Sequence, residues 1–275
     1  MVSLELEARL DNLLRTAQTE MANIDLFAPI EEREECPICL IPLPLIEDEI
    51  SFYACCGKNI CGGCIHKQIA TNIKKGLLDF HEYKCAFCRQ PESINLIKAI
   101  KKQMKKNNPD AFMAMAREYI AGKDVIRSDT KAIEMYIRAA ELGRAEAFGA
   151  IGSHYERGIL KQDNSKALEF YEVGAKKGSV QAHKDLAHFA VTVSMDIQKS
   201  NNHLKVAASA GDKEAMDNLM TAYKHEEISK EELTQILRVF QSSSNEMKSK
   251  DRDVYRLVEE SRKKGEPLPA HLRVT

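Results

Sequence analysis

All eight cysteines of this chain lie in one short segment, and six of them form three Cys-x-x-Cys pairs. The other two, Cys55 and Cys56, are adjacent. Thiolates in this pattern are typical ligands of zinc, and eight of them are enough for two tetrahedral four-sulfur sites. Sites of this kind leave no open position for water, so we expect two structural zinc ions and no hydrolytic chemistry. The full set is Cys36, Cys39, Cys55, Cys56, Cys61, Cys64, Cys85 and Cys88.

Composition and charge narrow the classes of partner. The 275 residues include 40 basic and 41 acidic side chains, for a net charge of −1, which gives no global support for a nucleic acid or anionic membrane partner. No apolar run approaches the roughly 18 residues that span a bilayer, and the charged N-terminal segment lacks a signal-peptide core. We therefore expect a cytoplasmic or nuclear protein, where a reducing environment favours metal binding over disulfides.

The elements that must position these cysteines follow from hydrophobic periodicity. Residues 1–30 contain an amphipathic helix over 3–23, which we expect to pack on another part of the chain, since two heptads are too few for a coiled coil. The cysteine module occupies 31–91. A basic connector helix is predicted over 92–108, and its row of lysines is interpreted as a solvated face because no aromatic or arginine residues accompany them.

Residues 109–245 repeat themselves with a period of 36, 35 and then 33 residues, as the equivalent positions Ala111, Ala147, Ala182 and Ala215 define. Such a period predicts helical hairpins stacked as a solenoid, because one hairpin cannot bury its own apolar face. A glycine closes the second helix of each of the first three repeats, where a left-handed residue is needed. Residues 246–275 are predicted to be a C-terminal capping helix and tail. The expected fold is therefore mainly α: a small zinc domain plus a helical solenoid. The closing glycines are Gly143, Gly178 and Gly211.

The cysteine module resembles a RING domain in the variant with cysteine in place of the usual histidine. The resemblance rests on the stretches CPICLIPLP, CCGKNICGGCI and CAFCRQP. It implies a cross-brace in which the ligand pairs interleave: Cys36, Cys39, Cys61 and Cys64 would hold one zinc ion, and Cys55, Cys56, Cys85 and Cys88 the other.

The sequence departs from the RING pattern at Cys55 and Cys56, since the third and fourth ligands usually have a residue between them. Adjacent ligands require a tight turn, for which Gly57 is suited. His66 is the reserve ligand if one of the pair fails, and His81 is a weaker one.

The resemblance implies an E3 ubiquitin ligase, which acts through an E2 enzyme and has no covalent intermediate. Ile38, between the first two ligands, would contact the E2, together with Ile69 or Ile73 of the following helix. Arg89, after the last ligand, would bridge E2 and ubiquitin with its forked donors. Against this, Ala86 replaces a common proline and the chain has no tryptophan. The alternative is a non-catalytic zinc-binding interaction scaffold.

The repeats resemble Sel1-like repeats, relatives of the tetratricopeptide repeat. The similarity is clearest in residues 111–144 and 147–179. Arrays of this kind bind protein segments, so the resemblance implies recruitment of an unidentified protein substrate or partner.

Overall fold

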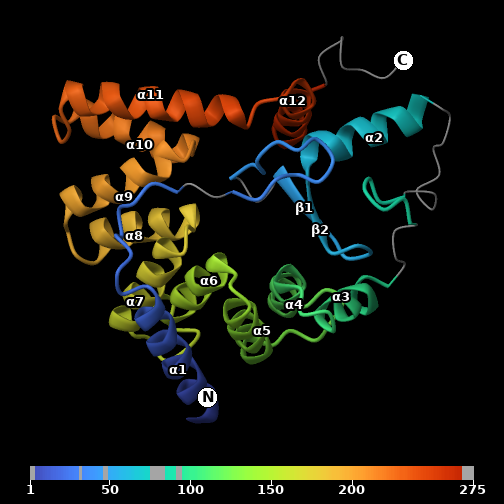
Figure 1. The fold of residues 1–275 in the computed structure, drawn as a ribbon, viewed down its shortest axis with the longest axis horizontal. Helices are drawn as coiled ribbons and strands as arrows, with labels where there is room; N and C mark the ends of the chain where they lie inside the picture. Colours follow the sequence, from blue (N-terminus) through green and yellow to red (C-terminus); the bar gives the residue numbers. More distant parts are fainter. Residues whose placement is uncertain (1–3, 31–32, 46–48, 75–83, 91–94, 268–275) are drawn as a thin grey trace. The chain divides into compact units, whose positions relative to one another are not determined.

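Helices make up most of the computed structural model, which confirms the predicted mainly α fold (Figure 1). The chain divides into two compact units, and each unit is built from two separate stretches of sequence. The first unit comprises Met1–Glu32 and Met104–Ser244, and the second comprises Arg33–Gln103 and Asn245–Thr275. The structure describes residues 4–30, 33–45, 49–74, 84–90 and 95–267.

The first unit contains the repeats as a series of helices, and between Pro109 and Lys224 each helix packs chiefly against its neighbours in the chain. The predicted register is confirmed, because all four alanines that define the period have no solvent exposure. Its repeat helices are α4 (Pro109–Ala121), α5 (Asp129–Glu141), α6 (Ala145–Glu156), α7 (Asn164–Lys176), α8 (Val180–Thr192), α9 (Ile197–Ser209), α10 (Lys213–Lys224) and α11 (Lys230–Glu246).

Local sequence explains where these helices begin and end. Gly143, Gly178 and Gly211 have φ angles of 90°, 90° and 98°, the left-handed conformation that lets the chain turn after α5, α7 and α9. Ser179 and Asp212 then cap α8 and α10, since their side-chain oxygens accept hydrogen bonds from backbone N–H groups of the first turn. Each glycine and cap together make the sharp reversal that stacks one hairpin on the next.

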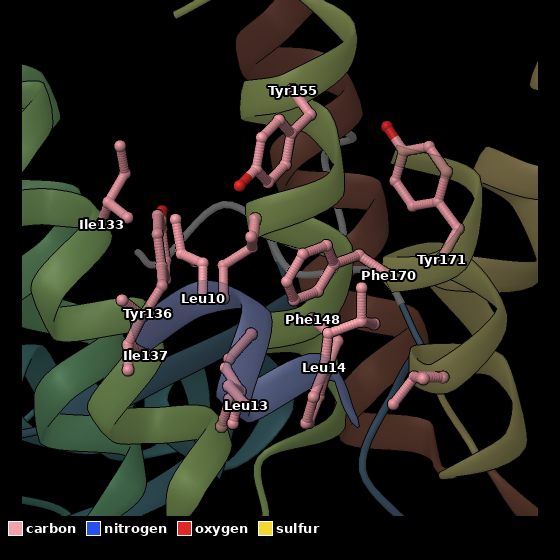
Figure 2. Packing of buried hydrophobic residues seen from close by; sticks show 14 of the residues in the cluster. Leu10, Leu13, Leu14, Ile133, Tyr136, Ile137, Phe148, Tyr155, Phe170 and Tyr171 are labelled. Atoms are coloured by element: carbon pink, nitrogen blue, oxygen red, sulfur yellow. The ribbon is translucent and has the colours of Figure 1, made fainter. Parts of the chain in front are cut away.

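The N-terminal helix α1 (Leu4–Glu20) is part of the first unit and packs against α5 and α7. Leu10 is fully buried and lies with Phe148 and Phe170 in one apolar cluster (Figure 2). On its polar side, Lys166 donates a hydrogen bond of 2.6 Å to Asp11. The predicted amphipathic helix thus packs on the repeats and covers apolar surface that the hairpins leave open.

The second unit contains the cysteine segment and a hairpin in which Tyr53 pairs with Lys58. Helix α12 (Lys250–Lys264) packs on α2 (Gly62–Lys74) in this unit. The helix predicted within residues 246–275 forms, but it does not cap the repeats: it belongs to the cysteine unit, where its buried Arg252 donates hydrogen bonds to the segment around Pro42. The elements are β1 (Ile50–Tyr53), β2 (Lys58–Cys61), α2 (Gly62–Lys74), α3 (Leu96–Met104) and α12 (Lys250–Lys264).

Within the described ranges, no helix combines the length and the apolar character needed to cross a lipid bilayer.

Candidate metal centres

The sulfur atoms of the eight cysteines gather into two groups of four. Within each group all four sulfurs lie within 4.8 Å of one another, so each group could hold a metal ion. The groups interleave along the sequence, and their membership is the one that the resemblance implied. The first group is Cys36, Cys39, Cys61 and Cys64, and the second is Cys55, Cys56, Cys85 and Cys88.

The spacing of the sulfurs fits a tetrahedral metal ion. In the first group, Sγ–Sγ distances are 3.9 Å for Cys36 and Cys64 and 3.9 Å for Cys39 and Cys61. In the second group, the Sγ–Sγ distance is 3.7 Å for Cys56 and Cys85 and 3.6 Å for Cys55 and Cys88. A metal–sulfur bond of about 2.3 Å in tetrahedral geometry places sulfurs about 3.8 Å apart. A disulfide would need about 2.05 Å, and all eight cysteines are free.

Two of the Cys-x-x-Cys pairs form the same backbone turn. In the first, the Cys36 N–H donates to the carbonyl five residues later, and the Leu40 N–H donates back to the Cys36 carbonyl. Cys85 and Arg89 make the equivalent two bonds in the second. Leu40 and Arg89 both have left-handed φ angles, 56° and 60°. Each turn, hereafter a knuckle, aims two cysteine sulfurs at one point.

The adjacent cysteines lie in the turn that joins β1 to β2. The N–H groups of Cys56 and Gly57 both donate to the Tyr53 carbonyl, at 3.2 Å and 2.7 Å. Gly57 adopts a φ of 71°, which a residue with a Cβ rarely takes. This tight turn brings both neighbouring sulfurs into the second group. His66 belongs to neither four-cysteine group, and His81 lies outside the described residues.

The third Cys-x-x-Cys pair joins a strand to a helix. Cys61 ends β2, and Cys64 lies in the first turn of α2. Gly62 and Gly63 lie between them because α12 approaches closely: a Cβ on Gly63 would stand 2.7 Å from the backbone nitrogen of Arg252.

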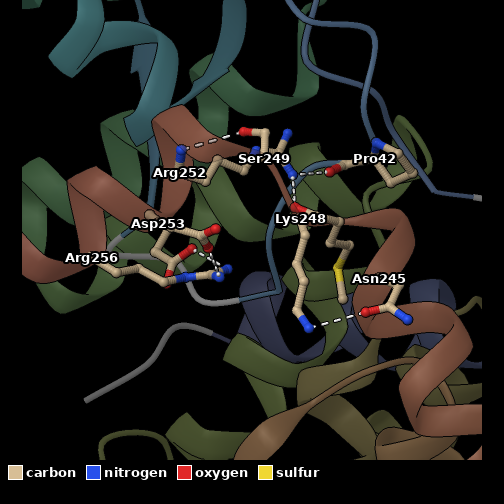
Figure 3. Close-up of polar contacts among 9 residues, drawn as sticks. Pro42, Asn245, Lys248, Ser249, Arg252, Asp253 and Arg256 are labelled. Carbon is tan, nitrogen blue, oxygen red and sulfur yellow. Dashed lines mark hydrogen bonds and ion pairs between the residues drawn. The ribbon is translucent and has the colours of Figure 1, made fainter.

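Sequence reasoning missed two buried polar side chains beside these groups. Gln103 of α3 is 2% exposed and donates to the carbonyls of Ala54 and Cys55, at 3.0 Å and 3.1 Å. Arg252 of α12 is 1% exposed and bonds to the first knuckle (Figure 3). Neither stands in a recognisable motif. The paired glycines at 62 and 63 were the one signal that a further element would pack there.

A second arginine of α12 anchors the helix through a carboxylate. Arg256 makes two hydrogen bonds to Glu49, of 2.7 Å and 2.9 Å, and this pairing raises the pKa of the guanidinium. Glu49 is buried and Arg256 is partly exposed, and the two charge-assisted hydrogen bonds hold α12 against the segment before β1.

The residues with an implied role in E2 binding lie at the surface of the knuckles. Ile38 is 40% exposed, and Phe87, at the equivalent place in the second knuckle, is 43% exposed. Arg89 is also exposed, whereas Ile69 and Ile73 are half-buried on α2. Each knuckle therefore presents an apolar side chain outward, and the second adds a cation.

The repeat unit is identified by a family comparison. Residues 109–143 and 150–179 match the model of the Sel1 repeat. The chain contains Sel1 repeats. The Sel1 repeats at 109–143 and 150–179 imply a protein-interaction scaffold, since stacked hairpins of this type present an extended surface. No curated protein matches the chain.

Solved structures of repeat proteins are also similar. A Sel1 repeat protein from Oxalobacter formigenes is 25% identical with a TM-score of 0.48, over 66% of this chain and 73% of that one. A protective antigen of uropathogenic Escherichia coli with an SLR fold is 19% identical with a TM-score of 0.47, over 74% of this chain and 42% of that one.

Proposed function

We propose that this protein is a RING-type E3 ubiquitin ligase whose two four-cysteine groups bind zinc and whose Sel1 array recruits protein partners. The observation that carries the proposal is the pair of interleaved four-sulfur groups, with Sγ–Sγ distances of 3.6–3.9 Å. Bound zinc would tie together segments distant in sequence and supply much of the folding free energy of a module with little apolar core.

The ligase would act by positioning. Ile38 and Phe87 would contact an E2 enzyme that carries ubiquitin as a thioester, because both are exposed apolar side chains on neighbouring ligand turns. Arg89 would use its planar fork to hydrogen-bond to E2 and ubiquitin together. Holding the thioester in one reactive arrangement lowers the entropic part of the barrier to transfer, without a nucleophile from the ligase.

The competing proposal is a non-catalytic zinc scaffold. It is favoured by Ala86, which is buried at the position where ligases commonly have proline, and by the absence of tryptophan from the sequence. Under this proposal the knuckle surface would bind a protein without transfer of ubiquitin.

Single-turnover discharge of ubiquitin from a panel of charged E2 enzymes onto free lysine separates the two. We expect the wild-type protein to accelerate discharge and Arg89→Ala to slow it about 10- to 100-fold, the loss of charge-assisted hydrogen bonds of about 1.5–3 kcal/mol. Arg262→Ala is the matched control, because Arg262 is an exposed arginine on α12 of the same unit. Wild-type protein with two bound zinc ions and no effect on any E2 would refute the ligase and leave the scaffold.

A further inference from the structure

Arg252 is the largest fully buried side chain in the described part of the protein, with 1% exposure. It lies in α12, 213 residues from Cys39 in sequence. One guanidinium nitrogen donates to the Pro42 carbonyl at 2.6 Å and to the Met247 carbonyl at 2.9 Å. The other donates to the Ile41 carbonyl at 3.2 Å and to the Cys39 sulfur at 3.5 Å. The side chain thus joins α12 directly to the first knuckle.

The charge of Arg252 needs a counter-charge. A buried cation is costly unless a negative group lies close to it. Among the described residues, no carboxylate pairs with Arg252, and its partners are neutral carbonyls and one sulfur. Four thiolates around a divalent ion carry a net charge of −2. A metal-loaded first group would therefore supply the negative charge that this buried guanidinium lacks.

Arg256, by contrast, has a carboxylate partner. It lies one turn later on α12 and forms its ion pair with Glu49 at 2.7 Å. The contrast between the two arginines indicates that Arg252 is not simply an anchor for the helix. Its position beside Cys39 gives it an electrostatic relation to the first group that Arg256 does not have.

The backbone between Cys61 and Cys64, on the other side of the first group, also packs closely against α12. Gly62 and Gly63 lie between Cys61 and Cys64, and a Cβ on Gly62 would overlap the ring of Tyr255. A Cβ on Gly63 would meet the backbone of Arg252. Helix α12 is therefore in contact with both halves of the first group: the Cys39 knuckle through hydrogen bonds and the Cys61–Cys64 turn through close packing.

We propose that Arg252 is a positioning residue of the Cys36, Cys39, Cys61 and Cys64 metal site, and that α12 is a required part of that site. The guanidinium holds the knuckle carbonyls in place, donates to the Cys39 sulfur and balances the negative charge of the loaded site. This inference rests on the proposed metal binding and deepens it. Outer groups of this kind commonly change metal affinity 10- to 100-fold.

The second site provides an internal comparison. Gln103 fixes the turn of Cys55 and Cys56 through two carbonyls, and it is neutral. Of the two four-cysteine groups, Arg252 hydrogen-bonds to the first and Gln103 to the turn that carries the second, so the two side chains act on different sites. Arg252→Ala should weaken one site and spare the other.

The test uses the full-length protein loaded with Co²⁺, whose sulfur-to-cobalt charge-transfer bands report on each thiolate. We expect Arg252→Ala to lower the affinity of one of two sites 10- to 100-fold and to shift its charge-transfer band to lower energy, since a sulfur that loses a hydrogen bond donates more readily. Arg252→Lys should recover part of the affinity because it keeps the charge. Arg262→Ala, at an exposed arginine of the same helix, should leave the band in place.

Different outcomes would overturn the proposed metal binding and the proposed role of Arg252. A wild-type protein that binds neither Co²⁺ nor Zn²⁺ would overturn metal binding and this inference together. A wild-type protein with two ions, and an Arg252→Ala variant with unchanged affinity and spectrum at both sites, would overturn the inference alone. If Arg252→Ala fails to fold, Arg252→Lys and Arg252→Gln provide the same comparison, because a role in charge balance requires the lysine variant to bind more tightly.

Discussion

The repeat register makes a quantitative prediction at Tyr155. Its ring is 1% exposed and stacks on Phe170 with ring centroids 5.7 Å apart. Removing a buried aromatic side chain costs about 3–5 kcal/mol. Tyr155→Ala should therefore lower the free energy of unfolding by about 4 kcal/mol and the melting temperature by about 10 °C.

The contribution of the Tyr155 hydroxyl group to stability can be measured separately from that of its ring. It donates a hydrogen bond of 3.0 Å to Glu7 of α1, and burial, together with Glu7, raises the pKa of the phenol well above its usual range. Tyr155→Phe removes only this bond, which is partly exposed, so we expect a loss of about 1 kcal/mol. The difference between the two variants isolates the packing of the ring.

The fourth repeat provides the matched control. Tyr223 occupies the position equivalent to Tyr155 but is 39% exposed. Tyr223→Ala should change the free energy of unfolding by less than about 1 kcal/mol. The assay is urea denaturation followed by far-ultraviolet circular dichroism, whose signal comes mostly from helices. Equal losses in Tyr155→Ala and Tyr223→Ala would refute the reasoning, because they would show that burial at this position does not decide stability.

Two further predictions concern the metal sites and pH. Cys36→Ser should leave one bound metal ion instead of two, counted by native mass spectrometry; retention of both would exclude Cys36 as a ligand. Burial lowers the pKa of His183 to about 4 and of His203 to about 3. Because the unfolded chain takes up these protons near pH 6.5 and the folded one does not, stability should fall as pH drops from about 6.5 toward 4. Asp185, whose pKa burial raises to about 6, opposes this, so Asp185→Asn should steepen the fall in urea titrations.

The repeats were predictable because their signals are local. Ala111 and its equivalents mark sites where helices approach closely, and Gly143 marks a left-handed turn. The conformation or close packing that each of these residues permits can be inferred from the residue type and its position in the repeat, without knowledge of the rest of the chain. The same holds for Gly57, which permits the tight turn that Cys55 and Cys56 need.

The place of α12 was not predictable in this way. Its sequence, KDRDVYRLVEESRKK, has few apolar residues, so periodicity indicates a helix but no direction for its buried side. Arg252 and Gln103 resemble surface residues, and only the tertiary structure surrounds them with carbonyls. Their partners lie 210 and 49 residues away, beyond the range of any spacing rule.

The division of each unit into two stretches of sequence affects how the protein is made. A ribosome releases all eight cysteines and most of the Sel1 array before Asn245–Thr275 emerges. Until then, the first four-cysteine group has its thiols but not Arg252. A product ended by a premature stop codon near residue 244 would carry all eight cysteines yet lack the helix beside the first group. A fragment limited to residues 31–91 also lacks α12, so the proposed role of Arg252 can be tested only in a protein that contains Asn245–Thr275.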